Sequence, residues 1–91
     1  MRYEWDEAKR KANILKHGID FVDVPAIFAG DTVTVIDERF DYGETRYLTL
    51  GLLKTRVIVA VHTETADVIR IISARKATHY EEKSYFDQIA D

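Results

Sequence analysis

The sequence has no cysteine, which excludes disulfide bonds and thiolate metal ligands within its 91 residues. It also has no apolar run approaching the ~20 residues of a membrane-spanning helix. No apolar stretch follows the positive charge near the N-terminus, so no secretory signal is predicted. We therefore expect a cytoplasmic protein that does not associate with a membrane.

Positive charge is also scarce, because 13 lysine and arginine residues face 16 aspartate and glutamate residues and the net charge is −3. This balance argues against a protein that coats nucleic acid with its whole surface. The cations are nevertheless concentrated in residues 9–17 and 54–76, while the acids gather at 37–44 and near the C-terminus. We expect a compact basic patch on an acidic body.

The chain has no internal repeat and no low-complexity segment. A sequence of this length has room for one hydrophobic core. Residues 1–91 are therefore expected to form a single domain.

Two helices are predicted in the first third of the chain. Asp6 is a candidate N-cap and Gly18 a candidate C′ residue for the first helix. Four apolar residues recur between them at helical spacing and predict one buried stripe: Trp5, Ala8, Ala12 and Leu15. A second helix is expected from Asp20 to about Ala29, with a late start or a kink at Pro25 because proline lacks a backbone donor.

From Thr32 onwards the apolar pattern changes to a period of two. It indicates four strands, at 32–37, 45–52, 56–63 and 68–73, besides a short edge strand at 2–5. The short connections predict an antiparallel meander, and Thr78 and Glu81 form a capping box that opens a last helix. The predicted order is (β)ααββββα: an α+β fold with helices on one face of an antiparallel four-stranded sheet and the other face open.

Several side chains are suited to phosphate binding or proton transfer. His62 ends an apolar strand and is either a structural histidine or a proton-transfer group. His17 lies in the last turn of the first helix. It is either a plain helix-end residue, whose positive charge interacts favourably with the helix dipole, or part of a site. Arg70 interrupts an apolar strand and must face water, an acid or a ligand. Arg75 has the planar fork that clamps phosphate.

The sheet register is left open by the sequence. His62 and Arg70 share a face only if the hairpin between them contains a bulge or an odd-length loop. The three histidines show no metal-ligand spacing, so neither a metal site nor a cofactor is predicted.

Four segments, which together span nearly the whole chain, resemble the BrnT toxin family. The first contains Glu4-Trp5-Asp6, Lys9, Asn13 and Lys16-His17-Gly18; the others are Phe21 to Phe28, Arg46 to Gly51 and His62-Thr63 through Thr78. The resemblance implies a RelE-like fold and a bacterial type II toxin that cleaves RNA and blocks translation. It also implies a BrnA-like ribbon-helix-helix antitoxin, which would make the contacts to operator DNA when the pair represses its own operon. The last helix is more acidic than such a family suggests, so it could face the antitoxin.

The expected reaction is metal-independent RNA cleavage by attack of the 2′-hydroxyl on the adjacent phosphate. The candidate catalytic residues are His62, Arg70, Arg75 and His17. The candidate RNA-binding residues are Lys9, Asn13, Lys16, Lys76 and Tyr80. The alternative is a non-catalytic module whose cationic sheet face binds an acidic peptide or nucleic acid. Ile14, Phe40 and Tyr42 are candidate apolar contacts for the antitoxin if they are exposed.

Overall fold

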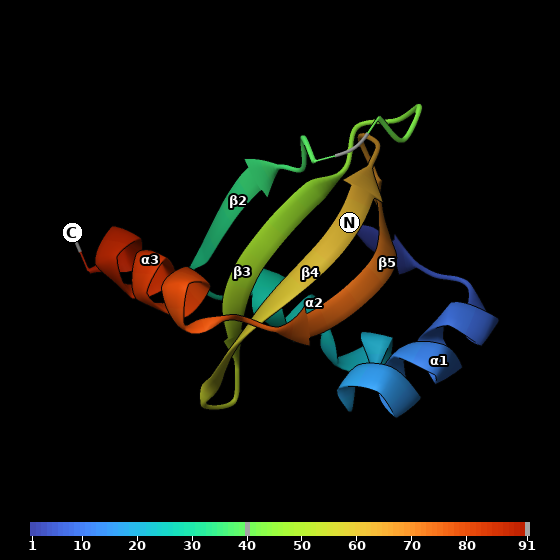
Figure 1. Ribbon diagram of the computed structural model, residues 1–91. Coiled ribbons are helices and arrows are strands. Elements are labelled where there is room, and N and C mark those ends of the chain that lie inside the picture. The colour runs from blue at the N-terminus through green and yellow to red at the C-terminus, as the bar shows by residue number, and fades with distance from the viewer. Residues whose placement is uncertain (40, 91) are drawn as a thin grey trace.

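The computed structural model describes residues 1–39 and 41–90. Its elements in chain order are β1 (Arg2–Glu4), α1 (Glu7–His17), the short 3-10 helix η1 (Phe21–Asp23), α2 (Pro25–Phe28), β2 (Thr32–Ile36), β3 (Tyr47–Leu53), β4 (Arg56–Glu64), β5 (Val68–Lys76) and α3 (His79–Ile89). The strands form one sheet in the order β1-β5-β4-β3-β2 (Figure 1). The α+β class is confirmed, but the sheet has five strands and is mixed, because β1 pairs in parallel with β5.

The β4–β5 hairpin is regular from its turn to the pair of His62 and Ile71, and a β-bulge follows between His62 and Val61. Thr63 pairs with Arg70 and Val61 pairs with Ser73. Directly paired residues share a face, and successive residues of a strand alternate between faces. Arg70 and Ser73 therefore lie on one face of the sheet, and His62 lies on the other.

One face carries the larger core and is covered by η1 and α2, and Figure 1 shows α2 behind the strands. Phe21 of η1, Ile27 of α2 and Val24, which joins the two helices, are at most 1% exposed. They belong to one cluster with strand residues Ile58, Ala60, Ile69, Ile71 and Ala74. This cluster fixes the segment that follows α1 against the sheet.

The opposite face is partly covered by α3, so the expectation that all helices pack on one face is wrong. Tyr85 is 1% exposed and clusters with Leu50, Val57 and Val59, which alternate with the residues of the larger core. The Tyr85 hydroxyl also donates a hydrogen bond to the backbone oxygen of Asp31, at 2.8 Å. The sheet thus has two cores, and α3 leaves only part of its face uncovered.

The ends of α1 are those expected from the sequence. Asp6 accepts a hydrogen bond from the Lys9 backbone N–H at 3.0 Å, and Gly18 ends the helix at a φ of 71°. The predicted apolar stripe is wrong, however, because Leu15 is 90% exposed and Ala8 and Ala12 are also exposed. The helix does not attach to the sheet through these side chains.

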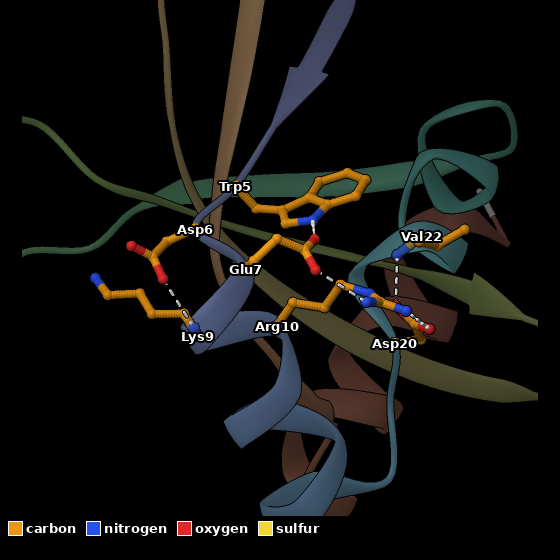
Figure 2. Close-up of polar contacts among 7 residues, drawn as sticks. All are labelled: Trp5, Asp6, Glu7, Lys9, Arg10, Asp20 and Val22. Atoms are coloured by element: carbon orange, nitrogen blue, oxygen red, sulfur yellow. Dashed lines mark hydrogen bonds and ion pairs between the residues drawn. The ribbon is translucent and has the colours of Figure 1, made fainter.

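Polar contacts hold α1 in place instead. Figure 2 shows Trp5 donating to Glu7, Glu7 paired with Arg10, and Arg10 paired with Asp20 through two hydrogen bonds of 2.8 and 3.0 Å. Asp20 also accepts from the Val22 N–H and caps η1. These contacts fix the start of α1 against η1.

The second helix of the prediction is divided in two. The 3-10 helix η1 ends at Asp23, and α2 begins at Pro25, which occupies the first turn where its missing N–H is tolerated. The kink predicted at this proline is confirmed as a break between two short helices.

None of the helices described within residues 1–39 and 41–90 has the length and apolar character of a membrane-spanning helix.

Candidate active site

A basic hollow lies where the end of α1, the end of β5 and the start of α3 meet. Its volume is about 580 Å³, and its lining consists of Lys16, His17, Arg39, Arg75, Lys76 and Thr78. Figure 1 shows the end of β5 lying between α1 and α3. We call this feature the basic hollow; it gathers four permanent cations, an imidazole and a hydroxyl from segments far apart in the sequence.

Each flank of the basic hollow is positioned by a helix end. Gly18 terminates α1 directly after Lys16 and His17, so both side chains lie in the last helical turn. Thr78 is the N-cap of α3 and lies two residues after Lys76, the end of β5. Both caps therefore lie beside a pair of predicted site residues. Lys16 and His17 precede the cap of α1, Arg75 and Lys76 precede the cap of α3, and the two pairs meet at the basic hollow.

Arg75 is held in a fixed orientation by Glu81. Two hydrogen bonds of 2.7 and 3.0 Å join the guanidinium Nη1 and Nη2 to the two carboxylate oxygens. Glu81 is also the N3 residue of the capping box and accepts from the Thr78 N–H at 2.9 Å. The Arg75 hydrogen bonds, with those from Thr78, lower the pKa of Glu81 to about 2, so it is ionised at neutral pH.

The two lysines of the basic hollow carry uncompensated charge. Lys16 and Lys76 are exposed and form no ion pair with any residue in the described part of the chain. The partly buried His17 ring likewise has no hydrogen bond or ion pair within residues 1–39 and 41–90. These three side chains are free to contact a bound anion, which suits a phosphate diester.

Arg39 also lines the basic hollow and was missed in the sequence, where it lies in an acidic loop. It forms two hydrogen bonds of 2.8 and 2.9 Å with the buried carboxylate of Asp37. This pairing holds the pKa of Asp37 well below its usual range. The available signal in the sequence was a single arginine within an acidic loop. A buried acid needs a cationic partner, so this pattern could have predicted the pair of Asp37 and Arg39.

His62 does not reach the basic hollow. It is 0% exposed, and its Nε2 lies 2.7 Å from the Thr49 hydroxyl. Tyr47 stacks on the ring, and Phe28 meets it edge-on. Burial lowers the pKa of His62, so the ring is neutral at neutral pH.

Arg70 is separated from both other members of the expected catalytic group. It lies on the sheet face opposite His62, is paired with Glu4 of β1 at 3.3 Å, and does not line the basic hollow. The expectation that His62, Arg70 and Arg75 gather around one open face is therefore wrong. The physical reasons are the register of the β4–β5 hairpin, which pairs His62 with Ile71, and the packing of His62 into the core.

Asn13 has a structural role that the sequence did not reveal. It is 6% exposed, and its side-chain amide donates to the backbone oxygens of Ile19 and Ala74, both at 2.9 Å. Its side-chain oxygen accepts from the Ala74 N–H at 3.2 Å. Asn13 thus continues the pairing of β5 beyond the end of β1, and its side chain is not available to RNA.

The remaining candidates are at the surface but outside the basic hollow. Lys9 is exposed two turns before Lys16 on the same side of α1, and Tyr80 is 82% exposed at the start of α3. Among the expected apolar contacts, Ile14 is 37% exposed, whereas Tyr42 is partly buried and bonds to Asp37. Phe40 lies outside the described residues.

No group of three or more histidine, aspartate or glutamate side chains in the described part of the chain is arranged to hold a metal ion. The groups that the basic hollow offers are instead cations, an imidazole and hydrogen-bond donors. Such a set can bind a phosphate diester and transfer a proton to or from it.

The comparisons with known proteins agree with this chemistry. No curated protein matches the chain. A protein family described as "Ribonuclease toxin, BrnT, of type II toxin-antitoxin system" matches residues 5–81, a range that includes α1, the whole sheet from β2 onwards and every residue lining the basic hollow. The chain therefore belongs to the BrnT family of ribonuclease toxins, whose members act in type II toxin–antitoxin systems with an antitoxin partner and RNA as the substrate.

Proposed function

We propose that this protein is a RelE-like endoribonuclease toxin that inhibits translation and cleaves RNA at the basic hollow without a metal ion. The observation that carries the proposal is the convergence there of Lys16, His17, Arg75 and Lys76. Two of these cations lack an ion pair within the described residues, so the hollow attracts a phosphate although the net charge of the chain is −3.

The proposed reaction is an internal transesterification. The 2′-oxygen of a ribose attacks the adjacent phosphorus, and the bond from phosphorus to the 5′-oxygen breaks. The products are a 2′,3′-cyclic phosphate and a free 5′-hydroxyl. One proton leaves the 2′-hydroxyl and one is delivered to the departing 5′-oxygen, so the atoms balance without a metal or a redox partner.

The side chains of the basic hollow divide these tasks. His17 is the only imidazole among its described lining residues; it takes the proton from the 2′-hydroxyl and delivers it to the departing 5′-oxygen. Arg75, oriented by Glu81, and the two lysines stabilise the charge that develops on the phosphate oxygens. Lys9 extends the positive track along α1 and positions the RNA backbone, while Tyr80 offers a surface on which a base can stack.

A ribbon-helix-helix antitoxin is the proposed partner, and it would supply the contacts to operator DNA. The negative net charge of the toxin supports the assignment of the DNA contacts to the antitoxin, because DNA affinity requires many cations. Coexpression of the toxin with the open reading frame next to it, scored for rescue of growth, tests the partnership. Growth arrest that persists with that neighbouring protein present contradicts it.

The cleavage assay uses the purified protein, an RNA substrate, and parallel reactions with and without EDTA. His17→Ala and Arg75→Ala are each expected to lower the cleavage rate by about 10²-fold or more. His79→Ala is the matched control, since His79 is an exposed histidine that does not line the basic hollow. Equal rates for His17→Ala and His79→Ala would show that the site is misplaced.

Two other results address the mechanism and the class of function. Loss of cleavage in EDTA contradicts the metal-independent reaction. Growth arrest with intact RNA favours the alternative, in which the cationic surface binds an acidic peptide or nucleic acid without reaction.

A further inference from the structure

A second hollow, which we call the hairpin pocket, adjoins the basic hollow. It lies between the turn joining β3 to β4, the end of β5 and the connection from α1 to η1, and its volume is about 340 Å³. This volume is within the range of about 300–1,000 Å³ that is usual for small-molecule sites. None of the residues in the proposed reaction, except Lys76 at its wall, belongs to it.

The hairpin pocket combines an apolar interior with a cationic rim. Ile19 and Ile58 are 6% and 2% exposed, and the partly buried Leu53 joins them in the lining. Lys54 and Arg56, both exposed, come from the hairpin turn. An apolar hollow with cations around it suits an unstacked nucleobase that is attached to a phosphodiester chain.

The hairpin pocket and the basic hollow are neighbours on the surface. Lys76 lines both of them, and Gly18, which lines the hairpin pocket, directly follows His17, which lines the basic hollow. An RNA strand whose phosphate is held in the basic hollow therefore has the hairpin pocket as its neighbour along the surface. The base beside that phosphate is the part of the strand best placed to enter.

Asp23 gives the hairpin pocket a hydrogen-bonding preference. It is the only acid among the described lining residues, and its side chain forms no hydrogen bond or ion pair with any residue in the described ranges. A carboxylate accepts two parallel hydrogen bonds from adjacent donors. Guanine is the one RNA base with two adjacent donors, N1–H and N2–H, on its Watson–Crick edge.

We infer that the hairpin pocket binds the base next to the scissile phosphate and that Asp23 makes guanine the preferred base. This inference rests on the proposed function, since it takes the phosphate in the basic hollow as its reference point. It adds a sequence preference to the proposed cleavage reaction, and it assigns the specificity to η1 and the β3–β4 hairpin.

The test measures binding, so that it does not depend on cleavage. The probes are fluorescent 2′-O-methyl oligouridylates, which cannot react, carrying at one central position a guanine, an adenine or no base. The unaltered protein is expected to bind the guanine probe about tenfold more tightly than the other two. Asp23→Asn should bind all three probes alike, while Asp67→Asn, which alters an exposed acid in the β4–β5 turn, should keep the preference.

Equal affinity of the unaltered protein for the three probes overturns the inference. A guanine preference that survives in Asp23→Asn also overturns it, provided that thermal melting shows the variant to be folded. Failure of the proposed function is a separate result: guanine-selective binding by a protein that cleaves no RNA refutes the reaction but supports the pocket. Conversely, cleavage with no preference at the adjacent base refutes the pocket alone.

Discussion

Buried polar side chains hold together parts of this small protein that its apolar residues do not. Thr49 is 0% exposed and bonds to His62 on one side and to the Thr34 hydroxyl, at 2.8 Å, on the other. Asn13 bonds only to backbone groups. Because a buried polar group without a partner is costly, each of these contacts gives its residue a structural role. The density of polar residues near the N-terminus is thus largely a feature of the scaffold.

Asn13→Leu is expected to destabilise the protein strongly. The substitution leaves the backbone oxygens of Ile19 and Ala74 and the Ala74 N–H without their partner. Each buried group left unpaired costs about 1–3 kcal/mol. Urea unfolding measures the loss, and Lys9→Ala on the exposed side of α1 is the control, with an expected change within about 0.5 kcal/mol. Similar stabilities for the two variants would contradict the structural role of Asn13.

His62 is expected to make the fold less stable in mild acid. Burial lowers its pKa below the ordinary value of 6.5. As the pH falls through 6.5, the unfolded chain takes up a proton that the folded chain does not, so the free energy of unfolding falls until the pH reaches the folded pKa. Glu64, whose carboxylate lies 3.7 Å from Nδ1, opposes part of this shift.

Urea unfolding at pH 7.5 and pH 5.5 measures this effect as a difference between two free energies. The difference should be smaller in His62→Gln and unchanged in His79→Gln, which replaces an exposed histidine. Comparing differences removes the direct cost of losing the bond to Thr49. The same pH dependence in all three proteins would mean that His62 is not the responsible group.

At the scale of elements, short helices depend on the sheet for their stability. The four residues of α2 are too few to form a stable helix alone. Ile27 anchors α2, and a Cβ added at Gly51 of β3 would overlap the Ile27 side chain. Gly51 is therefore required by close packing between α2 and β3.

Gly51→Ala is expected to cost about 1–3 kcal/mol of stability through overpacking. Ile27→Ala, which removes the overlapping Cγ2, should cost about 2–5 kcal/mol alone. Because Ile27→Ala makes room for the added Cβ, the double variant should lose less stability than the two single variants lose together. The expected difference is about 0.5–3 kcal/mol. Thermal or urea unfolding of the four proteins completes the cycle, and strict additivity would contradict the proposed contact.

At the scale of the whole molecule, the positive charges gather at the two hollows although the net charge is negative. Lys16 and Lys76 bring unpaired charge to the basic hollow, and Lys54 and Arg56 continue it across the hairpin pocket. Acidic residues elsewhere, such as those of α3, keep the overall charge at −3. RNA binding is therefore expected to depend on a few local cations.

The salt dependence of RNA binding tests this charge distribution. For single strands, the slope of log K against log salt concentration is roughly −0.7 for each phosphate neutralised. Lys16→Ala and Lys76→Ala are each expected to make the slope shallower by about 0.7. Lys83→Ala is the control, since Lys83 is paired with Asp87 on α3 and lines neither hollow. An equal change of slope in Lys83→Ala would indicate diffuse attraction.

The sequence by itself determined the features that depend on neighbouring residues. The caps at Asp6, Gly18 and Thr78 and the break at Pro25 are local hydrogen-bond and backbone preferences, and the structure confirms them. The strands from Thr32 onwards and the α+β class follow from a local change of apolar period. Lys16, His17, Arg75 and Lys76 were also identified as candidates from the sequence.

Only the tertiary structure decided which of those candidates meet. The pairing of Thr63 with Arg70 and of His62 with Ile71 places His62 and Arg70 on opposite faces, and this register is set where the two strands meet. Arg39 reaches the basic hollow from a loop far away in the sequence. Asn13 belongs to the scaffold because its partner, Ala74, lies 61 residues further along the chain. Such contacts arise between segments that only the folded chain brings together, so no local pattern encodes them.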